Sequence, residues 1–121
     1  PKRLRFVEND EAVELLVKKY DFEIVDTDEL SAVEQVKLFS RASFVIGIHG
    51  AGLTNLMFAQ QPEKLIELFP SPDTGYLPFH YIMIASLKGM VYDALIGLPS
   101  ENKFSGGFLV DVIELEKLIK K

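Results

Sequence analysis

The residues best suited to chemistry stand together in "IHGAGLTN", residues 48–55. His49 is one of only two histidines in the chain, and it directly precedes the glycine-rich turn at residues 50–52. Glycines allow a tight turn with φ values closed to most residues, and their small side chains leave the backbone amides bare. If a helix begins near Leu53, its first N–H groups and its dipole favour an anion, above all a phosphate or diphosphate.

Three side chains around this turn would add contacts to such an anion. Thr54 and Asn55 offer donors, and His49 donates a ring N–H to a phosphate oxygen and supplies charge when it is protonated. The spacing is neither GxGxxG nor GxxxxGK[ST], because no third glycine and no lysine follow, and no GxSxG provides a nucleophilic serine. A purely structural turn, with His49 bonded to a neighbouring loop, therefore remains an alternative.

The elements that position the turn alternate between strands and helices. The patterns predict strands at residues 3–9, 22–26, 43–48, 64–69, 90–97 and 108–110, and helices at residues 10–20, 31–42, 53–61, 79–89 and 111–121. Ser31 and Glu34 stand at capping-box spacing before the second helix. This alternation predicts an α/β fold with a mainly parallel sheet and helices on both faces, and ligands bind such sheets at the carboxyl ends of their strands.

Length, charge and composition narrow the possible functions. A chain of 121 residues with 48% hydrophobic residues has room for one domain, so residues 1–121 are predicted to form a single domain. The net charge of -5 argues against broad nucleic-acid binding, and the lack of cysteine excludes disulfides and thiolate metal sites. No apolar stretch approaches the roughly 20 residues that cross a bilayer. Because no methionine or signal-peptide pattern opens the sequence, we expect a domain excised from a longer protein.

A longer pattern resembles a known family. The run "FSRASFVIGIHGAGLTNLMF" at 39–58, followed by "KLIELFP" at 64–70, is similar to the C-terminal half of glycosyltransferase family 61. That family includes plant wall-polysaccharide transferases, animal O-linked sugar transferases and bacterial capsular polysaccharide proteins, and the chain resembles the last type. The similarity extends over about residues 3–92 and implies the donor-binding domain of a GT-B transferase, three-layered and Rossmann-like, whose missing N-terminal domain holds most of the acceptor.

The resemblance also implies a set of substrate-binding residues: Arg3, Arg5, His49, Gly50, Ala51, Gly52, Thr54, Asn55 and Glu67. The residues of the turn would line the diphosphate, Glu67 would face the ribose or the turn, and Arg3 or Arg5 would neutralise the leaving diphosphate. Such preorganised groups stabilise the negative charge that grows on the diphosphate as the anomeric bond breaks. We expect no metal and no other cofactor in this domain.

The catalytic base is not identified in this chain. The resemblance implies inversion at the anomeric carbon, in which a base removes the acceptor's proton, and it places that base on the missing N-terminal half. Asp26, Asp28 and Glu29 are candidates here, but an acidic loop before a capped helix is more often solvated surface. Two roles are open for each of two further residues. His80 would reach the donor or be a surface or capping histidine. Tyr76 would stack on the base of the nucleotide or be part of the core.

The function predicted is therefore donor binding within a sugar transferase. Its partners would be a nucleotide-sugar donor, of which a UDP-sugar is favoured, and a glycan or polysaccharide acceptor, and the isolated domain is expected to fold without transfer activity. The alternative is a non-catalytic nucleotide-binding or scaffolding domain of the same fold. A flavodoxin-like or receiver-type domain fits the length, but no acidic cluster ends the first strand. The protein would be cytoplasmic in a bacterium and lumenal in the Golgi or endoplasmic reticulum of a eukaryote.

Overall fold

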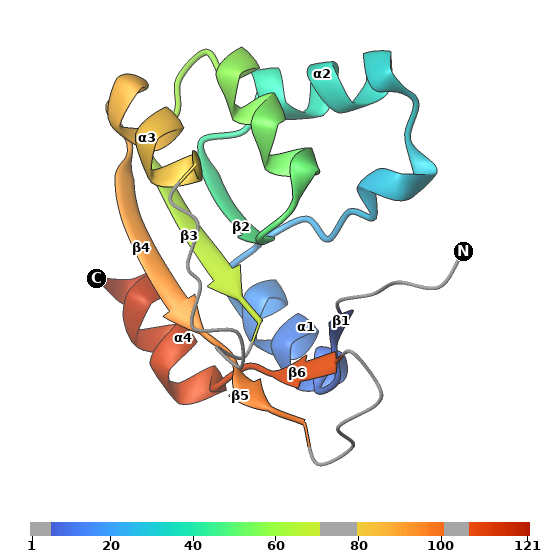
Figure 1. Cartoon of the computed structure of the whole chain (residues 1–121), viewed down its shortest axis with the longest axis vertical. Helices are drawn as coiled ribbons and strands as arrows, with labels where there is room; N and C mark the ends of the chain where they lie inside the picture. Colours follow the sequence, from blue (N-terminus) through green and yellow to red (C-terminus); the bar gives the residue numbers. More distant parts are fainter. Residues whose placement is uncertain (1–5, 71–79, 101–106) are drawn as a thin grey trace. The chain divides into compact units, whose positions relative to one another are not determined.

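A computed structural model describes residues 6–70, 80–100 and 107–121 of the chain (Figure 1). The chain divides into two compact units. One unit contains the residues up to Ile24, a segment that begins at Leu68 and the residues from Ala94 on, and the other contains Val25–Glu67 and a segment that ends at Asp93. None of the helices within the described ranges is long and apolar enough to cross a membrane.

The turn belongs to the unit that includes a parallel sheet. Strand β2 (Phe44–Ile48) lies in this unit, and β3 (Lys64–Phe69) and β4 (Val91–Ile96) begin in it. The order of the strands in the sheet is β2-β3-β4. Every residue of the central strand β3 is buried, whereas those of β2 are half-buried. The predicted parallel sheet is confirmed for these three strands. The short apolar run at residues 43–48 is typical of a strand buried on both faces, but its residues are half-buried because the middle position in the sheet belongs to β3.

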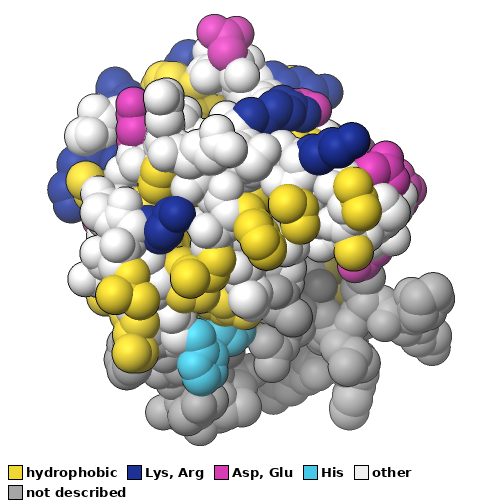
Figure 2. All heavy atoms as spheres, turned by 90° about the horizontal axis from the view of Figure 1, so that it is seen from above, with side chains coloured by type: hydrophobic (Ala, Val, Ile, Leu, Met, Phe, Trp, Pro, Cys, Tyr) yellow, Lys and Arg dark blue, Asp and Glu magenta, His cyan; other side chains and the backbone are white. Residues whose placement is uncertain are grey.

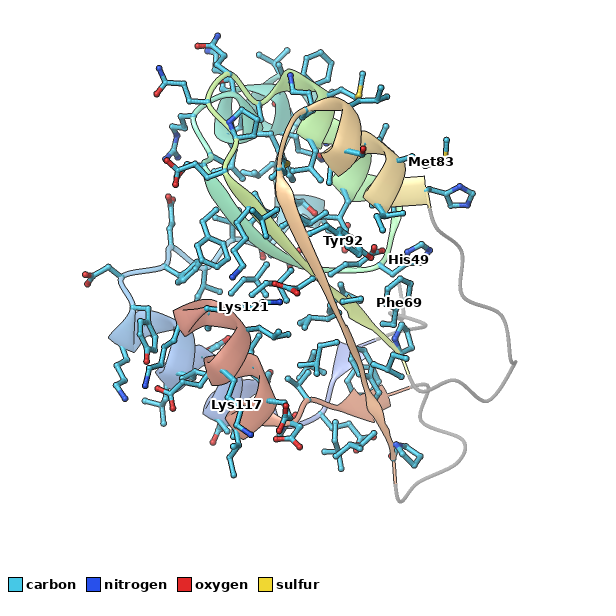
Figure 3. The ribbon with its side chains drawn as sticks, turned by 90° about the vertical axis from the view of Figure 1, so that its left-hand side faces the viewer. His49, Phe69, Met83, Tyr92, Lys117 and Lys121 are labelled. Atoms are coloured by element: carbon cyan, nitrogen blue, oxygen red, sulfur yellow. The ribbon has the colours of Figure 1, made fainter. Side chains whose placement is uncertain are left out.

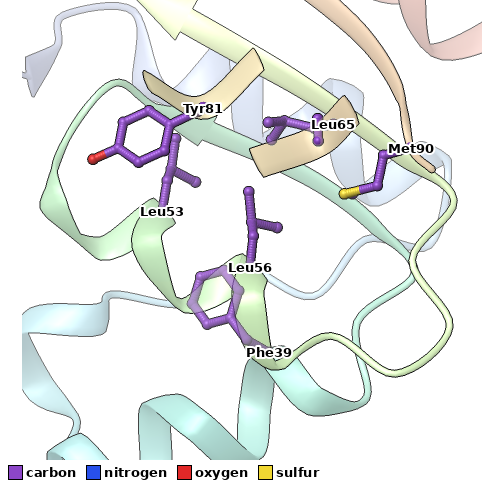
Figure 4. Close-up of a cluster of buried hydrophobic side chains, with 7 residues drawn as sticks. Phe39, Leu53, Leu56, Leu65, Tyr81 and Met90 are labelled. Carbon is purple, nitrogen blue, oxygen red and sulfur yellow. The ribbon is translucent and has the colours of Figure 1, made fainter. Parts of the chain in front are cut away.

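Three helices of this unit supply its core. They are α2 (Ala32–Ser40), the 3-10 helix η2 (Ala51–Phe58) and α3 (His80–Leu87). The buried cluster consists of Phe39, Leu53, Leu56, Leu65, Tyr81, Ala85 and Met90 (Figure 4). Leu53 and Leu56 lie on η2, directly after the turn at residues 50–52. Burial of these two side chains therefore fixes where the turn lies beside the sheet.

The start of α2 confirms the predicted capping box. The Ser31 hydroxyl accepts from the Glu34 N–H at 3.1 Å, and the Glu34 carboxylate accepts from the Ser31 N–H at 3.0 Å. The bond from the Ser31 N–H to the Glu34 carboxylate is the largest cause of the lowered pKa of Glu34. Local sequence alone thus determines where α2 begins.

The helix predicted after the turn is a 3-10 helix, and it begins at Ala51 instead of Leu53. The Leu53 N–H donates to the Gly50 carbonyl three residues back, at 3.1 Å. The Asn55 side-chain amide donates to the Gly52 carbonyl at 3.2 Å, and in an α-helix that carbonyl would accept from the N–H four residues later. The asparagine thus competes with α-helical bonding and favours the tighter helix.

The other unit contains a small mixed sheet. Strand β6 (Gly107–Leu109) lies between β1 (Phe6–Val7), to which it is parallel, and β5 (Leu98–Pro99), to which it is antiparallel. The described strands thus form two sheets instead of the one predicted, and the β5–β6 pair is an antiparallel exception to the predicted parallel arrangement. Only residues 100–106 separate these strands, and a parallel connection needs about a dozen residues or more.

Two helices accompany this sheet, and both agree with the sequence patterns. Helix α1 (Asp10–Lys19) follows Asn9, whose side chain donates to the Val110 carbonyl at 2.8 Å and accepts from the Val110 N–H at 2.9 Å. Helix α4 (Val112–Lys120) is capped by Asp111, which accepts from two backbone N–H groups. Asn9 is therefore the residue before α1, but its side chain bonds a distant strand end instead of capping the helix.

The prediction of a strand at residues 22–26 is wrong. Asp21 has a φ of 64°, and helix α1 closes there with the N–H groups of Asp21 and Phe22 bonded to its last carbonyls. The residues that follow form no strand and leave Ile24 45% exposed. One unit ends at Ile24 and the other begins at Val25, so these apolar side chains belong to a connection and not to a sheet.

The contact between α1 and α4 predicts a pH effect. Tyr20 donates to the Glu116 carboxylate at 2.7 Å and Lys19 at 3.0 Å, and these bonds, Tyr20's first, lower the pKa of Glu116. Since the folded pKa is below the unfolded one, the stabilisation is present above the unfolded pKa and is lost as pH falls through the folded pKa. We expect Glu116→Gln to reduce the loss of stability in urea unfolding from about pH 6 down to about pH 3. An unchanged acid slope would contradict this.

Candidate functional site

A histidine and a glutamate meet at the carboxyl end of β2. His49 directly follows this strand, and its Nδ1 lies 2.5 Å from Oε2 of Glu67 on β3. The Glu67 side chain is 0% exposed and that of His49 is 12% exposed. The sequence left open whether Glu67 faces the ribose or the turn, and in the structure its carboxylate contacts the histidine of the turn.

A tyrosine on β4 contacts the same glutamate. The Tyr92 hydroxyl donates to Oε1 of Glu67 at 2.6 Å, so both carboxylate oxygens have a partner. Figure 3 shows Tyr92 and His49 on neighbouring parts of this unit. Burial, and then the bond to the Glu67 carboxylate, raise the pKa of Tyr92, so this hydroxyl keeps its proton. No sequence motif singles out Tyr92, and the only signal for it is a polar-tipped residue in the strand predicted at residues 90–97.

The strand pattern explains why these groups converge. Alternate residues of a strand share a face, so Glu67 lies on the same face of β3 as Leu65 of the core cluster. His49 likewise continues the face of Gly47, where an added Cβ would lie 2.7 Å from Leu53 Cδ2. Glycine at 47 therefore lets Leu53 pack closely against β2 beside the histidine.

Two aromatic rings flank His49. The His80 ring stacks on it with centroids 6.3 Å apart and an interplanar angle of 24°, and Tyr81 meets it edge-on at 5.2 Å. His80 is exposed, and Figure 2 shows histidine atoms at the surface beside hydrophobic side chains. The sequence favoured a surface or capping role for His80, but the structure brings the chain's two histidines together.

The glycines of the turn do not need special backbone angles. Gly50 has φ 172° and ψ 167°, which is extended backbone, and among the described glycines only Gly89, with φ 72°, lies in the left-handed region. Among the atoms of the described residues, a Cβ at Gly50 would meet the Ile48 carbonyl at 3.7 Å, and one at Gly52 would meet Thr27 Oγ1 at 3.5 Å. The expectation that these glycines adopt φ values closed to other residues is therefore wrong here. Because glycine has no side chain, the N–H groups of Gly50 and Gly52 are still not covered by a side chain of the same residue.

The remaining predicted residues take different places. Thr54 is exposed on η2, and Ala51 begins that helix. Asn55 donates to the Gln35 side chain at 2.9 Å, and it thereby links η2 to α2. Arg3 and Arg5 lie outside the described residues, as does Tyr76. The structure thus brings His49, Glu67 and the turn together, and it uses Asn55 within the fold.

The acidic loop before α2 has a structural role. Asp26 Oδ1 accepts from the Asp28 N–H at 3.0 Å and caps the short 3-10 helix η1 (Thr27–Glu29). These residues also form an Asp-x-Asp spacing, which the expectation of a metal-free domain did not take into account. Within the described ranges, no group of three or more histidines and acids is arranged to hold a metal ion. The absence of a metal stays a prediction.

The sequence of this region matches a known family. Residues 1–66, which include β2, the turn, η2 and the first residues of β3, match the family profile described as glycosyltransferase 61. The chain belongs to glycosyltransferase family 61. The family named from the motif at residues 39–58 is therefore confirmed, and no solved structure matches this family 61 chain significantly.

Curated relatives of this family 61 chain are sugar transferases of plants and animals. It is 39% identical over 88 residues to a beta-1,2-xylosyltransferase of Oryza sativa subsp. japonica, covering 72% of this chain and 15% of that protein. It is 34% identical over 74 residues to the EGF domain-specific O-linked N-acetylglucosamine transferase of Drosophila melanogaster, covering 61% and 14%. A protein O-linked-mannose beta-1,4-N-acetylglucosaminyltransferase 2 of Canis lupus familiaris is 33% identical over 87 residues, covering 66% and 14%. The chain spans about a seventh of these relatives.

Proposed function

We propose that this chain is the nucleotide-sugar-binding domain of an inverting glycosyltransferase, the Rossmann-like donor half of a GT-B enzyme. The donor's diphosphate binds at the turn 50–52 and at His49, and the acceptor glycan is held mainly by a domain outside this sequence. Family membership and the parallel sheet β2-β3-β4 support the proposal. The observation that carries the site is the pair of His49 with the buried Glu67 at the carboxyl end of β2.

The pair and the start of η2 both favour an anion. A carboxylate at hydrogen-bond distance stabilises the protonated form of an imidazole, and with Nδ1 held by Glu67 the ring meets a ligand through Nε2. The N–H groups of Ala51 and Gly52 precede the first hydrogen bond of η2, which Leu53 donates. The His49 ring and the backbone donors at the start of η2 therefore converge beside the turn.

The glycines fit the same role. Neither the backbone angles of Gly50 nor its packing among the described residues explains a glycine at this position. A phosphate that approaches the backbone amides closely does explain it, because a side chain there would stand between the ligand and the N–H groups. We expect the glycines to serve the ligand more than the fold.

These groups match the charge that develops in the transfer. The acceptor oxygen forms a bond to the anomeric carbon while the bond to the diphosphate oxygen breaks, and the electron pair stays on the diphosphate. The acceptor's proton passes to a base that we place outside this chain. The His49 ring and the amides of the turn stabilise the diphosphate as its negative charge grows.

The relatives' names refine the donor. They specify transfer of xylose or N-acetylglucosamine by those proteins, and both sugars are compatible with the UDP-sugar proposed for this chain. A role in capsular polysaccharide synthesis and the location in the cell stay predictions from the resemblance alone.

A nucleotide titration tests the site. UDP, GDP, ADP and CMP would be added to the isotope-labelled chain while the amides of residues 50–53 are followed by NMR. We expect saturable shifts that favour UDP and a loss of about ten- to a hundredfold in affinity in His49→Ala, because a charge-assisted hydrogen bond contributes about 1.5–3 kcal/mol. His80→Gln is the matched control, since it alters the same pair of rings without touching Glu67, and it should weaken binding less.

The same experiment separates the alternatives. Unmoved amides at millimolar nucleotide, both in this chain and in the longer protein that contains it, would refute the donor site. Binding without sugar transfer by that longer protein would instead favour the non-catalytic nucleotide-binding domain.

A further inference from the structure

We propose that Tyr92 is a positioning residue for the diphosphate site: its hydroxyl keeps Glu67 ionised, so that the proton shared between Glu67 and His49 stays on the histidine. The identity of the ligand rests on the proposed function, whereas the position of the proton does not. No motif in the sequence points to Tyr92, and it lies on a different strand from both of the residues that it affects.

The geometry is a chain of two hydrogen bonds through one carboxylate. The Tyr92 hydroxyl donates to Oε1 of Glu67 at 2.6 Å, and Oε2 lies 2.5 Å from Nδ1 of His49. The Glu67 side chain is 0% exposed, so water does not replace either partner. A hydrogen bond donated to the charged form of a buried carboxyl favours that form. Burial raises the pKa of Tyr92, so its hydroxyl acts as a donor at neutral pH.

The proton in the Glu67–His49 contact has two possible positions. In one, a carboxylate faces an imidazolium, and in the other a neutral carboxyl donates to the unprotonated Nδ1 of a neutral ring. Both forms have the same net charge, and in both Nε2 carries a hydrogen. Only the first makes Nε2–H a cationic donor, and charge-assisted hydrogen bonds are roughly twice as strong as neutral ones. The tyrosine therefore determines how strongly the ring binds an anion without contacting that anion.

The rings that flank His49 act on its placement. His80 stacks on the His49 ring and Tyr81 meets it edge-on. These two rings therefore hold the His49 ring in the orientation in which Nδ1 contacts Glu67. The hydroxyl of Tyr92 is the group that bonds the far oxygen of the carboxylate. Removal of this one oxygen atom thus isolates the effect on the proton.

The test is Tyr92→Phe in the full chain, labelled with ¹⁵N-histidine. Because the chain has only two histidines, His80→Gln assigns the ring signals of His49. In the unmutated chain we expect Nδ1 of His49 to carry the proton of its contact with Glu67. In Tyr92→Phe the Nδ1 signal should move toward that of an unprotonated nitrogen. Affinity for UDP should fall about five- to tenfold, while affinity for uridine, which has no diphosphate, should not change.

Tyr20→Phe is the matched control, because it removes another tyrosine hydroxyl bonded to a carboxylate, that of Glu116. It should leave the His49 signals and the affinity for UDP unchanged. A purely structural role for Tyr92 predicts equal losses for UDP and uridine with an unmoved Nδ1 signal, and that result would overturn the proposal.

The outcomes also separate this proposal from the proposed function. If no nucleoside diphosphate binds the unmutated chain, the donor site is wrong, but a shift of the Nδ1 signal in Tyr92→Phe still supports the positioning role. If Tyr92→Phe does not fold, the unmutated chain decides, because an unprotonated Nδ1 there overturns the proposal and a protonated one supports it.

Discussion

Glu67→Ala is expected to lower the free energy of unfolding by about 3–5 kcal/mol and to abolish nucleotide binding, because it breaks a fully buried charged contact on both sides. The carboxylate is 0% exposed and holds both His49 Nδ1 and the Tyr92 hydroxyl. Alanine leaves these two polar groups in a buried space without their partner, and it adds a cavity in the central strand β3. Urea unfolding followed by circular dichroism measures the loss.

Glu67→Gln separates binding from folding. The amide oxygen of glutamine still accepts from Tyr92, so most of the stability should be kept, but the negative charge that favours the protonated His49 ring is gone. We expect a folded protein whose affinity for UDP is about ten- to a hundredfold lower. Glu63→Gln, at an exposed position just before β3, is the control and should bind normally. Tight binding of UDP by Glu67→Gln would refute a role for the carboxylate in the site.

The parts of the fold that local patterns determine are predictable from the sequence. The helix at residues 10–19 follows from apolar residues at spacings of three and four, and the start of α2 follows from Ser31 and Glu34. The apolar runs at β2 and β3 give strands because each is short, continuous and followed by residues that end it. Each of these elements is determined by residues that lie close together in the sequence, within about one helical turn or the length of one strand.

Long-range partners decide the rest. The segment at residues 22–26 has the apolar pattern of a strand but connects the two units, and β2 and β3 have similar patterns although only β3 is central. Asn55 shifts η2 toward a 3-10 helix through a bond to Gly52, and Asn9 bonds Val110, which is 101 residues away. Periodicity in a sequence shows which face of an element is apolar, but not what packs against it.

The candidate site also combines residues that the sequence reveals with partners that it does not reveal. His49 and its glycines are visible as a motif, and a glutamate in the apolar run "KLIELF" signals a buried charge that needs a partner. The partners themselves are set by strand order, which places Tyr92 beside Glu67 across 25 residues of sequence. A sequence therefore names the reactive residue more readily than the residue that adjusts it.

Gly97→Ala is expected to destabilise the protein by about 3 kcal/mol, at the upper end of the usual overpacking range. Gly97 lies between β4 and β5, and an added Cβ would collide with the Phe108 ring and lie 2.8 Å from the Phe69 carbonyl oxygen. Neither neighbour has room to move. Phe108 is 1% exposed and paired in β6, and the Phe69 carbonyl accepts from the Gly97 N–H at 2.7 Å.

Thermal unfolding measures this effect, and about 3 kcal/mol corresponds to a fall in Tm of roughly 10 °C for a chain of this size. Gly50→Ala is the matched control, because it adds the same methyl group where the nearest atom is 3.7 Å away, and its Tm should change little. Phe108→Leu removes ring atoms from the collision, so the double variant with Gly97→Ala should lose less stability than the two single losses predict. Strict additivity, or a normal Tm for Gly97→Ala, would show that Phe108 does not require glycine at position 97.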